Sequence, residues 1–461
     1  MATAAFARFE PPHPPRIATF QPGWRALYGE RLRNIVHGLP EPAFDVLHRQ
    51  TRLLHFRIHL VNDPAMIGHV LQGNPANYPR PPLARAVLRP FIGEGLLTAE
   101  GASWKLQRRI VAGAFTPAAV NRMTGLMSEA ARAQVDGWPG SSARIDFAAE
   151  ATRLTMAVIA DALFGGDPRL TTPEAGAHIA RIIAATAQAR PLTLLGLSHL
   201  DPSPGQVAVR RSGRWLRARI GGLVDDPARG DADDFFAGLL RALRHEYPRD
   251  TADALALDNA LTFFVAGHET SATALAWSAY LLAAQPALQE LLREEAVAAL
   301  AGPIWALIDR LPLLRQFLDE TMRLYPPLAQ ISRQALADDE IAGMTGAAVR
   351  VRKGDLLLIY PWLVHRHRKL WDDPDAFDFA RFSPERRPSQ HRFQYLPFGA
   401  GPRICVGLRF AQVEMLVILA HWLAARRFAL PEGAAPLPYG TVTLRPRGGM
   451  MLDIQPLVVP S

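Results

Sequence analysis

Apolar residues recur at steps of three and four through most of the stretch from residue 103 to residue 324, the spacing of one face of an α-helix. The clearest runs are Ala148–Leu163, Val207–Val224 and Leu255–Leu282. Clusters that contain proline and aspartate, such as 201–204, separate these runs, and residues of these types favour turns. The pattern therefore predicts a large helical body.

Strand-like patterns lie on either side of this helical stretch. Between Pro15 and about Ala76, runs such as Leu53–Val61 mix with helical pieces. Alternating or β-branched runs return at Ala347–Val351 and Leu356–Ile359. We expect these runs to form small sheets beside the helices.

The whole chain is predicted to be one mainly α domain over residues 1–461, because no long Gly/Ser linker, charge block or internal repeat divides it. The tail Val442–Ile454 is expected to close with a hairpin around Gly448-Gly449. The expected smaller β-rich subdomain takes in roughly 16–76, 330–360 and 440–456, and the expected helical body roughly 77–325 and 405–425.

Composition adds a cellular setting to this picture. The chain is 49% hydrophobic and 20% charged, an ordinary balance for a globular protein. The most apolar stretches, Leu356–Val364 and Val413–Leu423, are shorter than the ~18 residues of a membrane span, and Met1–Pro15 lacks the apolar core of a signal peptide. The formal net charge is +8, but the arginines that carry it are scattered. We expect a soluble cytoplasmic protein that has no transmembrane segment and binds no nucleic acid.

Cys405 is the only cysteine of the chain, and it ends the segment Phe398-Gly399-Ala400-Gly401-Pro402-Arg403-Ile404-Cys405. A lone cysteine can form no internal disulfide and cannot share a zinc or iron–sulfur site with other cysteines. Glycines let the backbone pass close to a flat ligand, and the N–H groups of a tight turn before a helix stabilise a thiolate. A nucleophilic cysteine needs a base, and the segment supplies none, while His391 cannot be placed from the sequence. The segment favours a metal-binding sulfur, and the alternative is a small buried side chain.

The segment 398–407 resembles the haem-binding loop of the cytochrome P-450 family, Phe-x-x-Gly-x-Arg-x-Cys-x-Gly, and fills every fixed position. In that family the cysteine is the proximal thiolate ligand of haem iron. The resemblance implies that Cys405 binds the iron of haem b and that Arg403 meets a haem propionate. It also implies that Phe398 forms an aromatic wall and that Gly401 and Gly407 shape the loop.

A second motif, Ala266-Gly267-His268-Glu269-Thr270, lies near the middle of the longest predicted helix. The small residues leave a gap where a planar group or a diatomic ligand can approach, and the Thr270 hydroxyl can bond to the Ala266 carbonyl and loosen the helical ladder. Alone, such residues indicate close helix packing. The motif resembles the family's Ala-Gly-x-(Asp/Glu)-Thr element, in which an acid–alcohol pair relays protons to bound dioxygen. The resemblance implies catalytic roles for Glu269 and Thr270, cofactor contact for Ala266 and Gly267, and a His268 that faces away from the iron.

Further motifs resemble the family's haem anchors. Trp104-Lys105-Leu106-Gln107-Arg108 places an indole N–H and a guanidinium one helical turn apart, and such donors converge on a carboxylate. By resemblance, Trp104 and Arg108 hold the haem propionates, and Arg333 joins them. For each of the three, the alternative is a solvated side chain.

The segment Glu320-Thr321-Met322-Arg323 resembles the family's Glu-x-x-Arg helix. In the family the pair is buried and is completed by an arginine from a later loop. We expect Arg381 to be that arginine, although Phe379 stands where the family usually has proline. These three residues are expected to be structural.

The resemblance implies a haem-dependent monooxygenase that inserts one atom of dioxygen into a lipophilic organic substrate, by hydroxylation or epoxidation. A separate ferredoxin or flavodoxin, with its reductase, is expected to supply the electrons and to dock on a basic cysteine-side face that includes Arg403 and Arg409. Two alternatives stay open: a peroxide-dependent or hydroperoxide-rearranging haem-thiolate enzyme, and a non-enzymatic haem-thiolate sensor. The expected access segments are Tyr78–Leu97 and Ile183–Val209.

Overall fold

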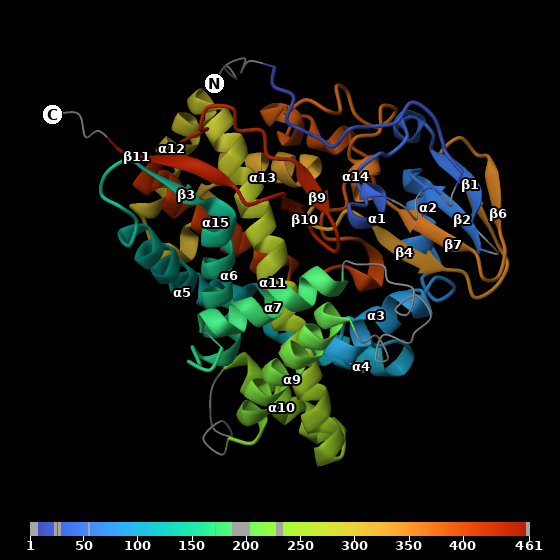
Figure 1. Ribbon diagram of the computed structural model, residues 1–461, viewed down its shortest axis with the longest axis horizontal. Helices are drawn as coiled ribbons and strands as arrows, with labels where there is room; N and C mark the ends of the chain where they lie inside the picture. The colour runs from blue at the N-terminus through green and yellow to red at the C-terminus, as the bar shows by residue number, and fades with distance from the viewer. Residues whose placement is uncertain are drawn as a thin grey trace.

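Helices make up most of the molecule (Figure 1). The computed structural model describes residues 8–22, 25, 29–53, 56–170, 172–186, 203–226 and 234–457. Its α-helices are α1 Glu30–Arg33, α2 Pro64–Gly68, α3 Pro82–Ile92, α4 Gly101–Ala112, α5 Pro117–Asp136, α6 Phe147–Phe164, α7 Pro173–Thr186, α9 Pro204–Val224, α10 Phe235–Glu246, α11 Arg249–Ala284, α12 Pro286–Leu300, α13 Pro312–Leu324, α14 Pro361–Val364 and α15 Leu408–Ala425.

Helix α11 organises the core. It is 36 residues long, and most of its residues are buried because the sequence is small or apolar on nearly every side. It packs against α6, α9, α10, α13 and α15, and in Figure 1 it runs through the middle of the molecule. A helix surrounded in this way can carry functional groups on more than one face.

Polar caps fix the ends of the helix that packs most closely on α11. At the start of α6, the Asp146 side chain accepts hydrogen bonds from the Ala148 and Ala149 backbone N–H groups. At its end, Gly165 takes a left-handed conformation with φ of 63°. Most apolar side chains between these caps are buried in the core, where α6 packs against α11.

The strands form four small sheets among the described residues. They are β1 His48–Leu53, β2 Phe56–Val61, β3 Ala143–Asp146, β4 Ile331–Gln334, β5 Asp339–Ala342, β6 Ala348–Val351, β7 Leu356–Ile359, β8 Arg426–Ala429, β9 Pro438–Gly440, β10 Leu444–Pro446 and β11 Met451–Pro456. The largest sheet has the order β1-β2-β7-β4, in which β2 and β7 are parallel. The others are β3-β11-β8, the pair β5-β6 and the pair β9-β10.

The predicted mainly α fold with a smaller β part is confirmed, and two details are wrong. Strands β3 and β8 lie outside the ranges predicted to be β-rich. The hairpin expected around Gly448-Gly449 does not form, because β10 pairs with β9 while β11 pairs with β3 and β8. The two glycines connect strands of different sheets.

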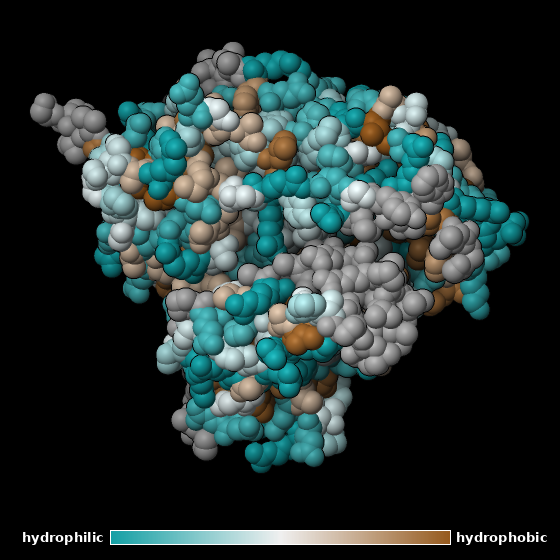
Figure 2. All heavy atoms as spheres, viewed as in Figure 1, coloured by the Kyte–Doolittle hydropathy of each residue, from teal (hydrophilic) through white to brown (hydrophobic). Residues whose placement is uncertain are grey.

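Helix α15 is longer than the apolar run seen in the sequence. By length and composition alone its 18 residues could cross a membrane, so the prediction that this segment is too short does not hold. However, 61% of these residues are buried inside the protein, against α5, α11 and α12. The face shown in Figure 2 is largely hydrophilic, with hydrophobic residues scattered over it.

Candidate functional site

The loop before α15 is folded so that Cys405 stands at its end. The Cys405 backbone N–H donates to the Phe398 carbonyl over 3.0 Å, and the Ile404 N–H donates to the Gly401 carbonyl over 3.0 Å. Gly399 and Gly401 have φ of 72° and 69°, a region that a side chain disfavours. These bonds close a tight turn directly in front of the helix.

The two glycines that the sequence assigned to loop shape differ in their surroundings. A Cβ on Gly401 would lie 1.8 Å from the Leu71 carbonyl oxygen, so a side chain cannot be accommodated there. Gly407 has φ of −86°, and a Cβ on it would meet the Phe115 ring at an ordinary 3.8 Å. Of these two glycines, Gly401 is therefore the one that backbone shape and close approach restrict to glycine.

The sulfur of Cys405 is accessible although protein surrounds it. The side chain is exposed, so the alternative of a small buried side chain is wrong. Burial of the site nevertheless raises the pKa of the thiol, while the Gly407 N–H and the Arg108 guanidinium lower it by smaller amounts. An accessible atom in a desolvated setting indicates an internal hollow.

Helix α11 also presents accessible positions within the core. Ala266 is exposed although most of its helix is buried. The Thr270 hydroxyl donates to the Ala266 carbonyl over 3.1 Å, as expected, and the two residues share one face because they are four positions apart. The helix stays α-helical throughout, so the expected loosening of the ladder is not observed.

The next two residues of this motif face α6 instead. A Cβ on Gly267 would come within 2.7 Å of the Ile159 Cδ1 atom, so the absence of a side chain lets α11 and α6 pack closely here. Contact between Gly267 and a cofactor stays a prediction. His268 is buried, its Nδ1 lies 2.6 Å from the Phe264 carbonyl oxygen, and the Thr155 hydroxyl donates to its carbonyl. His268 thus packs between α11 and α6. The sequence alone did not identify Phe264 and Thr155 as its partners.

Glu269 is held by two residues that sequence reasoning missed. Its Oε1 atom accepts a hydrogen bond from the Thr443 hydroxyl and forms an ion pair with Arg445. Both partners come from the β9–β10 segment near the end of the chain. No local pattern signals this contact, because the partners lie far from Glu269 in sequence.

The predicted propionate anchors lie close together. The Arg403 guanidinium lies 4.0 Å from the centre of the Trp104 ring, donates to the Ala99 carbonyl and pairs with Glu100. Burial, reinforced by nearby arginines, lowers its pKa to about 10. Arg333 is buried on β4, and burial together with Arg403 and a further arginine lowers its pKa to about 10 as well.

Two more arginines join this group without having been predicted. Arg80 donates to the Leu97 carbonyl, and its charge lowers the pKa of both Arg333 and Arg403. Arg85 also acts on Arg403, and its buried Nε atom has no hydrogen-bond partner among the described residues.

The charges in this group do not balance. Arg80, Arg85, Arg108 and Arg333 gather around Arg403, and Arg108 also acts on Cys405. Among the described residues, Glu100 is the carboxylate that interacts with this group. Buried cations are costly unless they are paired with anions. The group therefore suits a ligand that brings carboxylates of its own, and together with the accessible sulfur it fits a haem with two propionates.

The predicted structural ion pair is confirmed and extends further. Arg323 forms two hydrogen bonds with Glu320, at 2.7 and 2.8 Å, and both side chains are fully buried. Arg381 completes the group with an Nε–Oε1 distance of 3.2 Å to Glu320, despite Phe379 in the usual place of proline. Arg323 also donates to backbone carbonyls, including that of His365, so the network fixes the chain that leads to the cysteine loop.

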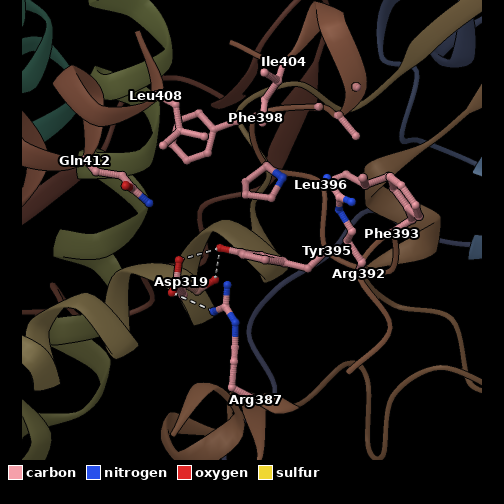
Figure 3. Close-up of a pocket in the computed structure, with 14 residues that line it drawn as sticks. Asp319, Arg387, Arg392, Phe393, Tyr395, Leu396, Phe398, Ile404, Leu408 and Gln412 are labelled. Atoms are coloured by element: carbon pink, nitrogen blue, oxygen red, sulfur yellow. Dashed lines mark hydrogen bonds and ion pairs between the residues drawn. The ribbon is translucent and has the colours of Figure 1, made fainter. Parts of the chain in front are cut away.

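A groove lies on the outer side of the cysteine loop (Figure 3). It has a volume of about 210 Å³ and is lined by Phe398 and by Asp319, which accepts hydrogen bonds from Tyr395 and Arg387. Arg392 is exposed at its edge. Arg403, in contrast, is turned inward, so its expected place on a docking face is wrong.

The predicted access segments are only partly described. Residues 78–97 include α3, whereas 187–202 lie outside the described residues.

Comparisons with known proteins agree with this geometry. The family model "Cytochrome P450" matches residues 49–202 and 228–452. Cyclooctatin synthase from Streptomyces melanosporofaciens is 31% identical over 80% of this chain and 78% of its own length. Cyclooctat-9-en-7-ol 5-monooxygenase from the same organism is 30% identical over 80% of each chain. A solved cytochrome P450 structure aligns with a TM-score of 0.77 at 26% identity, covering 91% of this chain and 96% of the other.

Proposed function

The chain belongs to the cytochrome P450 family of monooxygenases, and from that premise we propose that it hydroxylates or epoxidises a lipophilic organic substrate with Cys405 as thiolate ligand of haem b. The observation that best supports this proposal is the accessible sulfur of Cys405 beside a group of arginines whose positive charge exceeds that of the nearby carboxylate. When bound, the haem supplies the activation of dioxygen, which a thiolate ligand favours.

The residues of the chain have separable tasks in this proposal. Arg108, Arg333 and Arg403, with the unpredicted Arg80, hold the propionates, and Trp104 supports Arg403 through its ring. Ala266 leaves space on the accessible face of α11, and the Thr270 hydroxyl on the same face holds and passes on a proton.

The class of substrate is proposed from relatives and from the family. The Streptomyces melanosporofaciens relative is named for cyclooctat-9-en-7-ol, and a mouse relative, 28% identical over 81% of this chain, is named leukotriene-B4 omega-hydroxylase 3. Both names fit a lipophilic substrate and differ too widely to specify one. Titration of the ferric protein with terpenes, fatty acids and aromatics, followed by the spin-state absorbance change, would define it.

We also propose that a separate acidic ferredoxin or flavodoxin delivers electrons at the outer groove. Arg387 and Arg392 are exposed there, next to the cysteine loop, and cations at a docking face speed the association of an acidic partner. Turnover with such a partner should fall as ionic strength rises, and Arg392→Glu should weaken the interaction further. A turnover rate that is the same at low and high ionic strength, and the same in Arg392→Glu as in wild type, contradicts this docking site.

Substitution of the proposed iron ligand, Cys405, tests the proposed function. The reduced wild-type protein should give a red-shifted Soret band with carbon monoxide, and Cys405→Ser should lose that band. An unchanged band in Cys405→Ser, or a wild type that binds no haem when porphyrin is plentiful, overturns the proposal. Product formation with reductase and partner, compared with peroxide alone, separates the monooxygenase from the peroxide-dependent alternative.

A further inference from the structure

A pocket lies between α4, α5, α6 and α10. Its volume is about 590 Å³, and pockets of roughly 300–1,000 Å³ hold ligands the size of a drug molecule. Neither Cys405 nor Ala266 nor Thr270 lines it, so it is separate from the hollow at the cysteine loop. Most of its wall is apolar and includes Ile110, Met123, Leu126, Phe235 and Leu239.

Two glycines contribute open space to this pocket. A Cβ on Gly113, directly after α4, or on Gly238, in α10, would meet no described atom within 4 Å outside its own stretch of chain. Both glycines line the pocket, so neighbouring side chains do not fill the space beside them. One part of the wall is firmly packed, because the centre of the Phe235 ring lies 5.4 Å from that of Phe115 and 5.3 Å from that of Phe263.

One carboxylate in the wall lacks a partner among the described residues. The Asp161 side chain, near the end of α6, is half-buried and forms neither a hydrogen bond nor an ion pair with any of them. Burial raises the pKa of this carboxyl, and no nearby cation opposes the shift. A carboxylate that is partly removed from water is costly unless a cation accompanies it. Asp161 is therefore a suitable partner for a cation that enters the pocket.

The other charged groups at the pocket are placed differently. Asp234 caps α10, where its Oδ1 atom accepts a hydrogen bond from the Ala237 backbone N–H over 2.9 Å. Arg122 and Arg241 are exposed, so water solvates their charges. In the part of the chain that the structure describes, no group of three or more His, Cys, Asp or Glu side chains could hold a metal ion. The pocket thus suits an organic cation better than a bare metal ion.

We propose that this pocket is a second small-molecule site, which binds an organic ammonium ion with an apolar body, and that Asp161 holds the ammonium group. The carboxylate supplies the opposite charge, and the apolar wall removes the body of the ligand from water. Phe235 lines the same pocket, and aromatic rings attract ammonium ions. The site goes beyond the proposed function and does not rest on it, because haem and substrate are expected in the other hollow.

The test measures the binding of benzyltrimethylammonium to the full-length holoprotein by isothermal titration calorimetry. A quaternary ammonium ion has no lone pair for the iron, and 4-phenylimidazole, present throughout, occupies the hollow at the cysteine loop. We expect one probe molecule to bind per chain. Asp161→Asn should weaken its binding by roughly tenfold or more, because the partner charge is lost. Asp136→Asn removes an exposed carboxylate at the end of α5, outside the pocket, and should leave the affinity unchanged.

A second variant fills the pocket from another helix. Gly238→Leu places a side chain in the open space beside α10 and should abolish binding. Gly221→Leu adds the same side chain to α9, where there is equal room outside the pocket, and should bind the probe like wild type. A wild type that does not bind the probe overturns the proposal, as do equal affinities in wild type, Asp161→Asn and Gly238→Leu, or tighter binding of the anion phenylacetate. A wild type without the carbon monoxide band contradicts the proposed function alone, because probe binding is measured independently of that band.

Discussion

The carboxyl group of Glu414 should make the stability of this protein fall as pH rises. Glu414 lies on α15 and is fully buried, and no described residue lies at normal hydrogen-bond distance from its oxygens. Burial raises its pKa from 4.5 to about 8, and the nearby Ser271 hydroxyl on α11 offsets only part of this. The folded protein therefore keeps this proton at pH values where the unfolded chain has lost it.

The sign and size of the effect follow from linkage. Between pH 4.5 and 8 the unfolded state binds fewer protons than the folded state, so the free energy of unfolding decreases with pH. Each pH unit corresponds to ~1.4 kcal/mol, so the full interval amounts to about 5 kcal/mol. The contribution is present in full below pH 4.5 and is lost once pH passes about 8.

The substitution Glu414→Gln removes the titration and keeps the shape. Urea unfolding of wild type and variant, each with its cofactor, should show the variant more stable by only about 1–2 kcal/mol at pH 5.5. At pH 8.5 the variant should be more stable than wild type by about 4–5 kcal/mol, given the linkage above. The exposed Glu432→Gln serves as control and should follow wild type at both pH values. Parallel curves for Glu414→Gln and wild type would refute the reasoning.

Three further tests concern the packing around the site. Gly401→Ala should abolish haem retention, whereas Gly407→Ala should retain it, as measured by the ratio of Soret to protein absorbance; equal retention contradicts the close approach at Gly401. Glu320→Ala should lower the free energy of unfolding by about 3–5 kcal/mol because it leaves two buried arginines unpaired, and a loss under 1 kcal/mol in urea unfolding would argue against that. Gly267→Ala should cost about 1–3 kcal/mol through its clash with the Ile159 Cδ1 atom. Ile159→Val removes that atom and should recover part of the loss in the double variant.

The sequence predicted best those features whose partners lie within a few residues of one another. The cysteine loop and the Glu320–Arg323 pair are of this kind, because the spacing along a turn or a helix decides which groups meet. The long helix was equally clear, since a run of mostly small and apolar residues too long for a strand extends through it. Arg381 was found only because the resemblance pointed to a later loop.

The features that the sequence did not predict depend on packing between distant segments. Arg80 and Arg85 reach the anchor group from the segment before α4, and Arg445 reaches Glu269 from the end of the chain. The tail was misjudged for the same reason: a glycine pair signals a turn but does not say which strands pair on either side of it. The close approach of Gly267 to Ile159 is another contact of this kind, because the sequence does not tell which face of α11 meets α6.

The division of α11 into two faces explains how adjacent residues can serve different ends. Ala266 and Thr270 share the accessible face, while Gly267 faces Ile159 and Glu269 lines a cleft of about 920 Å³ beside α6. An acid that lay on the accessible face would bring a charge into a hollow that suits an apolar substrate, at a considerable desolvation cost. On the cleft side, the carboxylate keeps contact with Arg445 and lies one peptide bond from the residue that carries the hydroxyl. The helix thus keeps the charged Glu269–Arg445 pair apart from the face that carries Ala266 and Thr270.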